Sequence, residues 1–135
     1  MSFHVREKHL FVEEDFIGHS GGELHWKIEC DAITSPEWKC YWRMIFERER
    51  RPFQAAIGIP RGGLELGRWL NEYSTQNPEH PYLIVDDVLT TGGSMNEYKE
   101  DHLKGKDSFG WVVFARKQPQ PWVKALFQMP NYEIR

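Results

Sequence analysis

The sequence predicts an α/β domain with a mainly parallel sheet. From Phe53 onwards, three short apolar stretches alternate with two stretches of helical periodicity, in the order strand, helix, strand, helix, strand. Elements that alternate in this way form parallel sheets flanked by helices, joined by right-handed crossovers. The chain has 135 residues, of which 40% are hydrophobic. This is enough for a single domain spanning residues 1–135 with a core of its own.

The boundaries of these elements follow from apolar runs and turn residues. Three runs have the length of a strand, and the first two are expected to be buried. They are residues 55–59, 82–85 and 109–115. A helix is expected to start at Gly62 or Gly63 and a shorter one to span residues 94–104. Since ligands bind at the carboxyl ends of parallel strands, the loops that follow the first two strands are the candidate site.

The N-terminal part is expected to add a small irregular segment and a further helix. Within residues 1–34 we expect one strand, because apolar and polar residues alternate over residues 23–30. Ser35 and Pro36 suit a helix N-cap and the first helical position, and Pro52 ends that helix. Its apolar residues share one face, which we expect in the core. They are Trp38, Tyr41, Trp42, Ile45 and Phe46.

Charge and composition argue against several classes of function. The net charge is −3, and the charges of residues 47–51 alternate in sign, which indicates a solvated helix end and no nucleic-acid surface. No apolar run approaches the roughly 20 residues of a membrane span, and the first residues lack a secretion signal. We therefore expect a cytoplasmic protein with small-molecule ligands. Cys30 and Cys40 are expected to be free thiols, and the six histidines lack zinc-binding spacing.

The most informative stretch is Val85–Ser94, where an apolar strand runs into two carboxylates and then a turn. Gly92 and Gly93 let the backbone approach a ligand closely, and the N–H groups at the following helix start attract a phosphate. Asp86 and Asp87 can accept hydrogen bonds from vicinal ribose hydroxyls and can interact with Mg²⁺, directly or through water. The turn adds three hydroxyl donors. They belong to Thr90, Thr91 and Ser94.

A second loop, Gly58–Leu64, has the same strand, loop and helix arrangement. Gly62 and Gly63 at a helix start favour anion binding, and Arg61 offers a guanidinium that can bind a phosphate with two hydrogen bonds. Taken alone, this loop fits an ordinary turn as well as it fits an anion site. One helix separates it from Val85–Ser94, and the pairing favours a second anion site.

Together the two stretches resemble the type I phosphoribosyltransferases over roughly residues 53–117. Val85–Ser94 is similar to that family's signature for 5-phosphoribosyl-1-pyrophosphate: an apolar run, two Asp, two apolar residues, Thr, a small residue and Gly. The resemblance implies that Asp86 and Asp87 hold the ribose hydroxyls. It implies that the turn, from Thr90 through Thr91, Gly92 and Gly93 to Ser94, holds the 5′-phosphate.

The resemblance also implies a reaction. Gly58–Leu64 is similar to the family's pyrophosphate loop, so that Arg61, Gly62 and Gly63 would hold the pyrophosphate. The activity expected is Mg²⁺-dependent transfer of the phosphoribosyl group to a nucleobase, with Asp86, Asp87 and Arg61 as the catalytic group. The fold expected is a Rossmann-like parallel sheet with a small N-terminal hood, in a chain that can form a homodimer.

Two features favour orotate as the acceptor, and so a place in pyrimidine nucleotide biosynthesis. Thr90 stands where family members that use 6-oxopurines have an Asp, and Thr cannot act as a general base at neutral pH. The segment from His19 through Ser20, Gly21 and Gly22 to Asp31 resembles the hood of the orotate enzymes. His19 departs from their pattern, because they have a Lys there that helps to bind orotate.

One departure favours a binding protein instead. The family inserts a strand and a long mobile loop between the two motifs, and here only residues 74–81 separate the helix from the next strand. Closure over a site excludes water and completes its charge clamp. The alternatives are therefore a non-catalytic sensor of the pyrophosphate compound or a nucleotide and, less well supported, a flavodoxin-like nucleotide binder. Trp122 either stacks on a base or covers the core.

Overall fold

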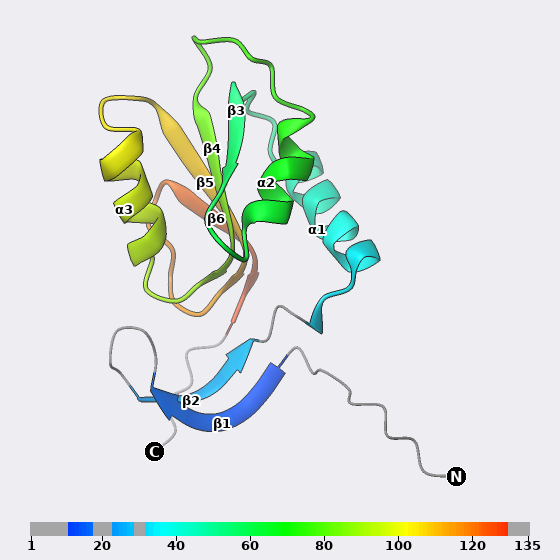
Figure 1. Ribbon diagram of the computed structural model, residues 1–135, viewed down its shortest axis with the longest axis vertical. Helices are drawn as coiled ribbons and strands as arrows, with labels where there is room; N and C mark the ends of the chain where they lie inside the picture. The colour runs from blue at the N-terminus through cyan, green and yellow to red at the C-terminus, as the bar shows by residue number, and fades with distance from the viewer. Residues whose placement is uncertain (1–10, 18–22, 29–31, 130–135) are drawn as a thin grey trace.

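A four-stranded parallel sheet forms the centre of the protein (Figure 1). The computed structural model describes residues 11–17, 23–28 and 32–129. The strands lie in the order β3, β4, β5, β6. They span Ala55–Gly58, Tyr82–Leu89, Ser108–Ala115 and Val123–Gln128. The predicted parallel α/β fold and its three strands are confirmed. Strand β6 was not predicted, and its six residues lack a two-residue alternation, because the buried Val123 and Leu126 are three positions apart and Phe127 is exposed.

Three helices flank the sheet. They are α1 (Ser35–Arg48), α2 (Leu64–Asn71) and α3 (Gly93–His102). The N-cap of α1 is Thr34 and not Ser35, because the Thr34 hydroxyl and the Glu37 carboxylate exchange hydrogen bonds with each other's backbone N–H. The prediction that its apolar face lies in the core is confirmed for Trp38, Trp42 and Ile45, whereas Phe46 is 42% exposed.

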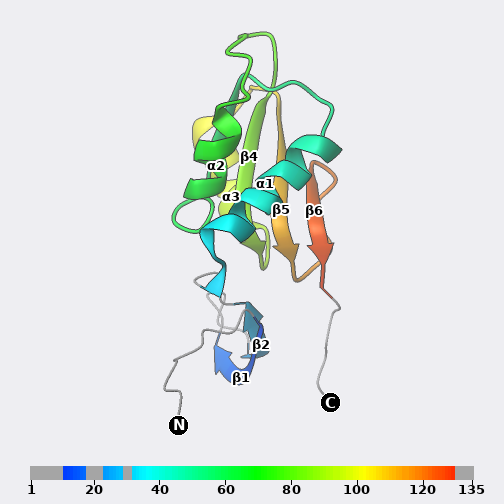
Figure 2. The same cartoon turned by 90° about the vertical axis from the view of Figure 1, so that its right-hand side faces the viewer.

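The two helical crossovers have opposite hands. Helices α1 and α2 pack on one face of the sheet and α3 packs on the other (Figure 2). Because the strand order is sequential, both crossovers step across the sheet in the same direction. The β4–α3–β5 crossover is right-handed and the β3–α2–β4 crossover is left-handed, so the prediction that all crossovers are right-handed is wrong. The physical reason is that residues 72–81 return the chain directly to β4, without a further strand beyond β3.

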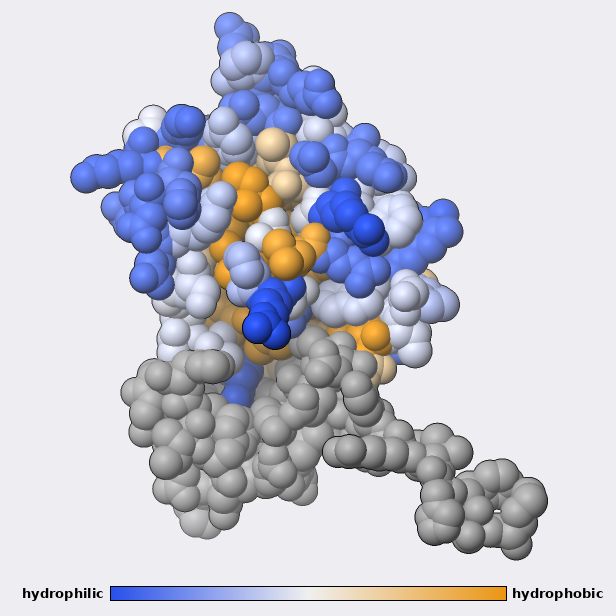
Figure 3. Space-filling model, in the orientation of Figure 1, coloured by the Kyte–Doolittle hydropathy of each residue, from blue (hydrophilic) through white to orange (hydrophobic). Residues whose placement is uncertain are grey.

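Strand β3 lies at the edge of the sheet, and its residues are half-buried instead of fully buried as predicted. Apolar side chains accordingly reach the surface over β3 (Figure 3). Helix α2 closes part of this edge. The Asn71 side chain accepts a hydrogen bond from the backbone N–H of Ala56 at 3.0 Å. Gly67 packs so closely on Gly58 that a Cβ on Gly67 would lie 2.4 Å from the Gly58 nitrogen. The Asn71 side chain thus occupies a backbone donor that another strand would need in order to pair with β3.

The connection from α2 to β4 is fixed at the amino ends of the strands, at the top of Figure 1. Thr75 and Gln76 donate backbone hydrogen bonds to the carbonyls of Phe53 and Gln54, at 2.8 and 3.2 Å. The Gln54 side chain donates to the His80 carbonyl at 2.8 Å. This loop therefore lies at the opposite end of the sheet from the two motif loops.

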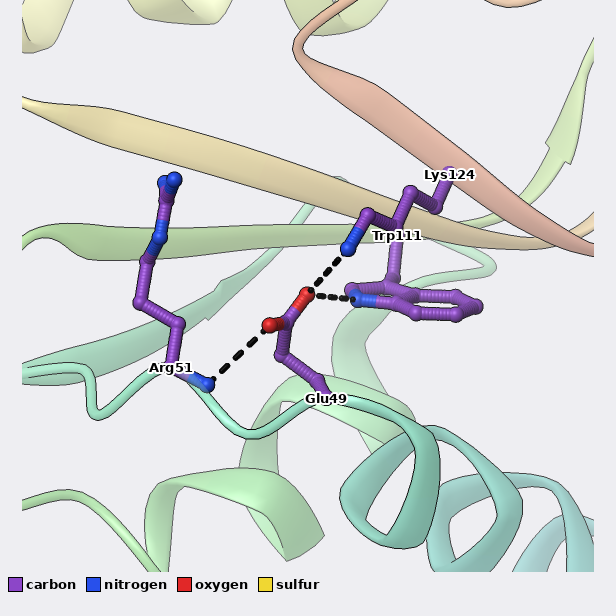
Figure 4. A network of polar contacts seen from close by, with 4 residues as sticks. All are labelled: Glu49, Arg51, Trp111 and Lys124. Atoms are coloured by element: carbon purple, nitrogen blue, oxygen red, sulfur yellow. Dashed lines mark hydrogen bonds and ion pairs between the residues drawn. The ribbon is translucent and has the colours of Figure 1, made fainter.

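The C-terminal end of α1 is joined to the sheet by a buried carboxylate, where the sequence predicted a solvated end (Figure 4). The Glu49 side chain is 9% exposed and accepts hydrogen bonds from the Trp111 indole at 2.9 Å, from the Arg51 backbone and from Lys124. Burial by itself would raise the pKa of Glu49, but these donors outweigh burial and lower that pKa.

A hairpin of two antiparallel strands lies beyond the carboxyl ends of the sheet (Figures 1 and 2). It consists of β1 (Phe11–Ile17) and β2 (Glu23–Ile28), and Phe11 pairs with Ile28. The strand predicted within residues 23–30 is confirmed, and β1 was not predicted. Across the described part of the chain, no helix has the length and hydropathy needed to cross a membrane.

Candidate functional site

The two motif loops meet at the carboxyl ends of neighbouring strands. The first follows β3 and covers residues 59–63, and the second follows β4 and covers residues 90–92. The Ile59 N–H donates a hydrogen bond to the Val85 carbonyl at 2.9 Å, which continues the β3–β4 pairing into the first loop. Sequence-distant residues of the two motifs are thus side by side, as their places after adjacent parallel strands require.

The first loop is a tight turn packed against β4. The Gly63 N–H donates to the Ile59 carbonyl at 2.9 Å, and the Pro60–Arg61 peptide bond is cis. A Cβ on Gly63 would lie 2.6 Å from the Val85 carbonyl oxygen, so only glycine permits this approach. The Arg61 side chain is exposed, so its guanidinium is accessible to an anion in solution.

The acidic pair lies inside β4, because that strand continues to Leu89 and does not end at Val85 as predicted. Asp86 is 8% exposed, and its Oδ1 accepts the Asp87 N–H at 2.8 Å. Asp87 Oδ1 accepts the Val88 N–H at 2.7 Å. Burial, together with the neighbouring Asp87 carboxylate, raises the pKa of Asp86 to about 9. This shift favours the neutral acid form of Asp86 in the free protein, and a bound cation would favour its ionised form.

Asp87 and Gly62 bring the two loops into direct contact. A Cβ on Gly62 would lie 1.8 Å from Asp87 Oδ2 and 2.3 Å from its carboxyl carbon. The carboxylate thus rests on the main chain of the first loop. Ligand groups bound to the loop and to the acidic pair would be immediate neighbours.

The second loop has the features of an anion site. Gly92 has φ +83° and is the N-cap of α3, and no acidic residue stands in the first turn of that helix. The Thr91 hydroxyl accepts the Gly93 N–H at 3.2 Å, and Thr90, Thr91, Gly93 and Ser94 are all exposed. A helix start with accessible N–H and hydroxyl donors, and without a nearby carboxylate of its own, suits a phosphate.

Trp122 and Arg116, in the C-terminal part of the chain, lie at opposite ends of the sheet. Trp122 belongs to the far end of the sheet, because its carbonyl accepts the N–H of Gly110 near the start of β5. Its ring packs with the α3-side core under Lys99, so the prediction that it covers the core is favoured over stacking on a base. Arg116 directly follows β5, and its backbone N–H donates to the Leu89 carbonyl at 2.9 Å. This half-buried cation lies beside the second loop, and burial lowers its pKa.

Arg116 was not among the predicted site residues, although its position could have indicated it. It is the first residue after a buried strand, at the same edge of the sheet as Thr90. The predicted hood residues His19, Ser20, Gly21, Gly22 and Asp31 lie outside the described residues.

The carboxylates suit one kind of metal site. In the described part of the chain, no three His, Cys, Asp or Glu side chains gather in a way that could hold a metal ion. Asp86 and Asp87 provide the one or two carboxylates with which proteins bind Mg²⁺ when substrate phosphates supply the other ligands. The residues therefore fit a Mg²⁺ ion that arrives with a diphosphate, and they do not fit an all-protein metal site.

Comparison with known proteins identifies the fold. No protein-family model and no curated protein sequence matches the chain. Among solved structures, it is similar to orotate phosphoribosyltransferase from Aeropyrum pernix (TM-score 0.69, 18% identity, 89% of this chain and 88% of that chain). It is also similar to UMP synthase from Leishmania donovani (TM-score 0.70, 13% identity, 89% and 34%). A third match is xanthine-guanine-hypoxanthine phosphoribosyltransferase from Helicobacter pylori (TM-score 0.50, 14% identity, 73% and 86%).

The chain therefore has the fold of the type I phosphoribosyltransferases, as the sequence motifs implied. Within that class the first two matches are named for orotate or UMP, and the third for purine bases. The fold is thus shared by proteins named for different bases.

Proposed function

We propose that the protein is a phosphoribosyltransferase that moves the phosphoribosyl group of 5-phosphoribosyl-1-pyrophosphate to a nucleobase and releases pyrophosphate. One observation carries this proposal. The acidic pair of β4, the loop at Arg61–Gly63 and the turn from Thr90 to Ser94 meet at the carboxyl ends of two adjacent strands. Each matches one part of the substrate: ribose, pyrophosphate and 5′-phosphate.

The roles of these residues follow from their chemistry. The exposed N–H and hydroxyl groups of the turn bind the 5′-phosphate, and Asp86 and Asp87 bind the ribose hydroxyls. When the bond at C1 breaks, positive charge develops on the ribose and negative charge on the departing pyrophosphate. Arg61 stabilises the pyrophosphate charge. Mg²⁺, when bound, would neutralise part of the same charge.

Orotate is our first candidate for the acceptor. Thr90 provides no general base for a purine, and Arg116 adds a cation at the edge of the site that suits an anionic base. The fold similarity to an orotate phosphoribosyltransferase supports the same choice. A role in pyrimidine nucleotide synthesis and a cytoplasmic location follow from this proposal.

A non-catalytic phosphoribosyl or nucleotide sensor is the second candidate. The observation in its favour is the connection from α2 to β4, which is fixed at the opposite end of the sheet and contains neither Lys nor Arg. This connection cannot cover the pyrophosphate or add positive charge there. An open charge clamp stays solvated and is correspondingly weak.

One experiment separates the two candidates. The protein is incubated with the pyrophosphate compound, Mg²⁺ and a panel of bases that includes orotate, uracil, hypoxanthine and guanine, and pyrophosphate release is measured. An enzyme should release pyrophosphate in the presence of one base. Binding by calorimetry without release for any base would support the sensor, and absence of binding would overturn both.

A further inference from the structure

Gly62 is the point where the two motifs touch. An ideal Cβ at this position would overlap all three atoms of the Asp87 carboxyl group, at 1.8 Å from Oδ2, 2.3 Å from Cγ and 2.7 Å from Oδ1. No backbone atom is among these three nearest neighbours. A side chain at position 62 would therefore collide first with the Asp87 carboxylate.

The collision would move a carboxylate that is otherwise held in place. Asp87 Oδ1 accepts the Val88 N–H at 2.7 Å, which fixes the orientation of the carboxyl group on β4. To escape a methyl group at position 62, the side chain must rotate and give up this hydrogen bond. The other glycines of the loop differ, because a Cβ on Gly58 or Gly63 would meet backbone atoms of Gly63, Ile59 or Val85.

We propose that Gly62 is a positioning residue for Asp87. The bare main chain of the first loop sets where the carboxylate of the second motif lies, so the geometry of ribose binding depends on a residue of the pyrophosphate loop. This inference rests on the proposed function for the ligand that Asp87 holds. The contact itself has a consequence that needs no ligand.

The first test measures stability by urea denaturation of four proteins: wild type, Gly62→Ala, Asp87→Ala and the double variant. Gly62→Ala should be destabilised in the presence of Asp87 and close to neutral in the Asp87→Ala background, because the colliding carboxyl group is absent there. Equal effects of Gly62→Ala in the two backgrounds would overturn the contact, since neighbours that interact are not additive.

The second test measures binding by calorimetry with two probes, ribose 5-phosphate and inorganic pyrophosphate, in the presence of Mg²⁺. Gly62→Ala should lower the affinity for ribose 5-phosphate roughly tenfold, which is the loss expected for a charge-assisted hydrogen bond. It should leave pyrophosphate affinity within about twofold, because Arg61 and the loop backbone remain in place. In the Asp87→Ala background the same change should have no further effect on ribose 5-phosphate.

The outcomes distinguish this inference from the proposed function. If wild type binds neither probe, the proposed function fails and the positioning role fails with it. If wild type binds both probes but Gly62→Ala weakens pyrophosphate as much as ribose 5-phosphate, or acts equally without Asp87, only the positioning role fails. If Gly62→Ala is too unstable to titrate, the urea comparison decides the question. The double variant should then be folded, because it lacks the colliding carboxyl group.

Discussion

Changing Asp86 to Asn should stabilise the free protein, although it removes a residue of the site. The pKa of Asp86 rises from its ordinary value near 4 to about 9, first through burial and then through Asp87. Because the folded-state pKa is the higher one, the contribution of this group to stability is complete below about pH 4 and is lost as the pH rises towards 9. At pH 7 the loss amounts to about 4 kcal/mol, from roughly 1.4 kcal/mol for each of about three pH units.

The assay is urea denaturation of wild type and D86N in EDTA at several values between pH 4.5 and 8.5. The difference in unfolding free energy should be small at the acidic end and should grow in favour of D86N as the pH rises. Asp101→Asn on the exposed surface of α3 is the control, and it should change the free energy by only a few tenths of a kcal/mol. A D86N variant that is less stable than wild type at pH 7.5, or a difference independent of pH, would show that Asp86 is already ionised in the free protein.

Three further variants and one product measurement test the site and its support. Replacing both Asp86 and Asp87 with Asn should weaken phosphoribosyl binding by about 1.5–3 kcal/mol for each lost charge-assisted bond, and unchanged calorimetric affinity would remove their assignment. Gly92→Val should lower the affinity for a nucleoside 5′-monophosphate at least roughly tenfold, since Val adopts the φ of +83° poorly. Equal binding of nucleoside and nucleotide by wild type would contradict a phosphate turn. Glu49→Ala should cost about 1–3 kcal/mol of unfolding free energy near pH 7, because the Trp111 indole loses its acceptor. Because the pKa of Glu49 is lowered in the folded state, its contribution to stability decreases as the pH falls. The cost of Glu49→Ala should therefore be smaller at pH 3 than near pH 7. Urea denaturation at both pH values checks this. With saturating orotate, hydrolysis to ribose 5-phosphate should accompany nucleotide formation if the site stays open; strict one-to-one stoichiometry of nucleotide to pyrophosphate would show that the site is covered.

Local sequence patterns predicted the elements that carry the site better than the elements that surround it. The order of carboxylates, hydroxyls and glycines in Val85–Ser94 places these groups on one strand and one turn, so no tertiary information was needed. Strand β6 and the half-buried state of β3 depend on which strands lie at the edges of the sheet. That is a property of the whole topology.

Two residues illustrate what local pattern cannot supply. Glu49 alternates with arginines as in a solvated helix end, yet its side chain is 9% exposed and accepts a hydrogen bond from Trp111, 62 positions away. Trp122 follows a Pro in an apolar segment near the end of the sequence, and only the register of β6 against β5 shows that it lies at the far end of the sheet. Long-range pairing decides both positions.

The position of the α2–β4 connection and the partly covered edge of β3 determine where a longer loop would leave the fold. A longer loop inserted between residues 74 and 81 would emerge at the amino ends of the strands, away from Arg61 and Asp87. A strand added beside β3 would compete with the Asn71 side chain for the backbone N–H of Ala56. The short connection and the Asn71 contact thus act together, because one keeps the chain at the amino ends of the strands and the other occupies a backbone donor on the outer side of β3.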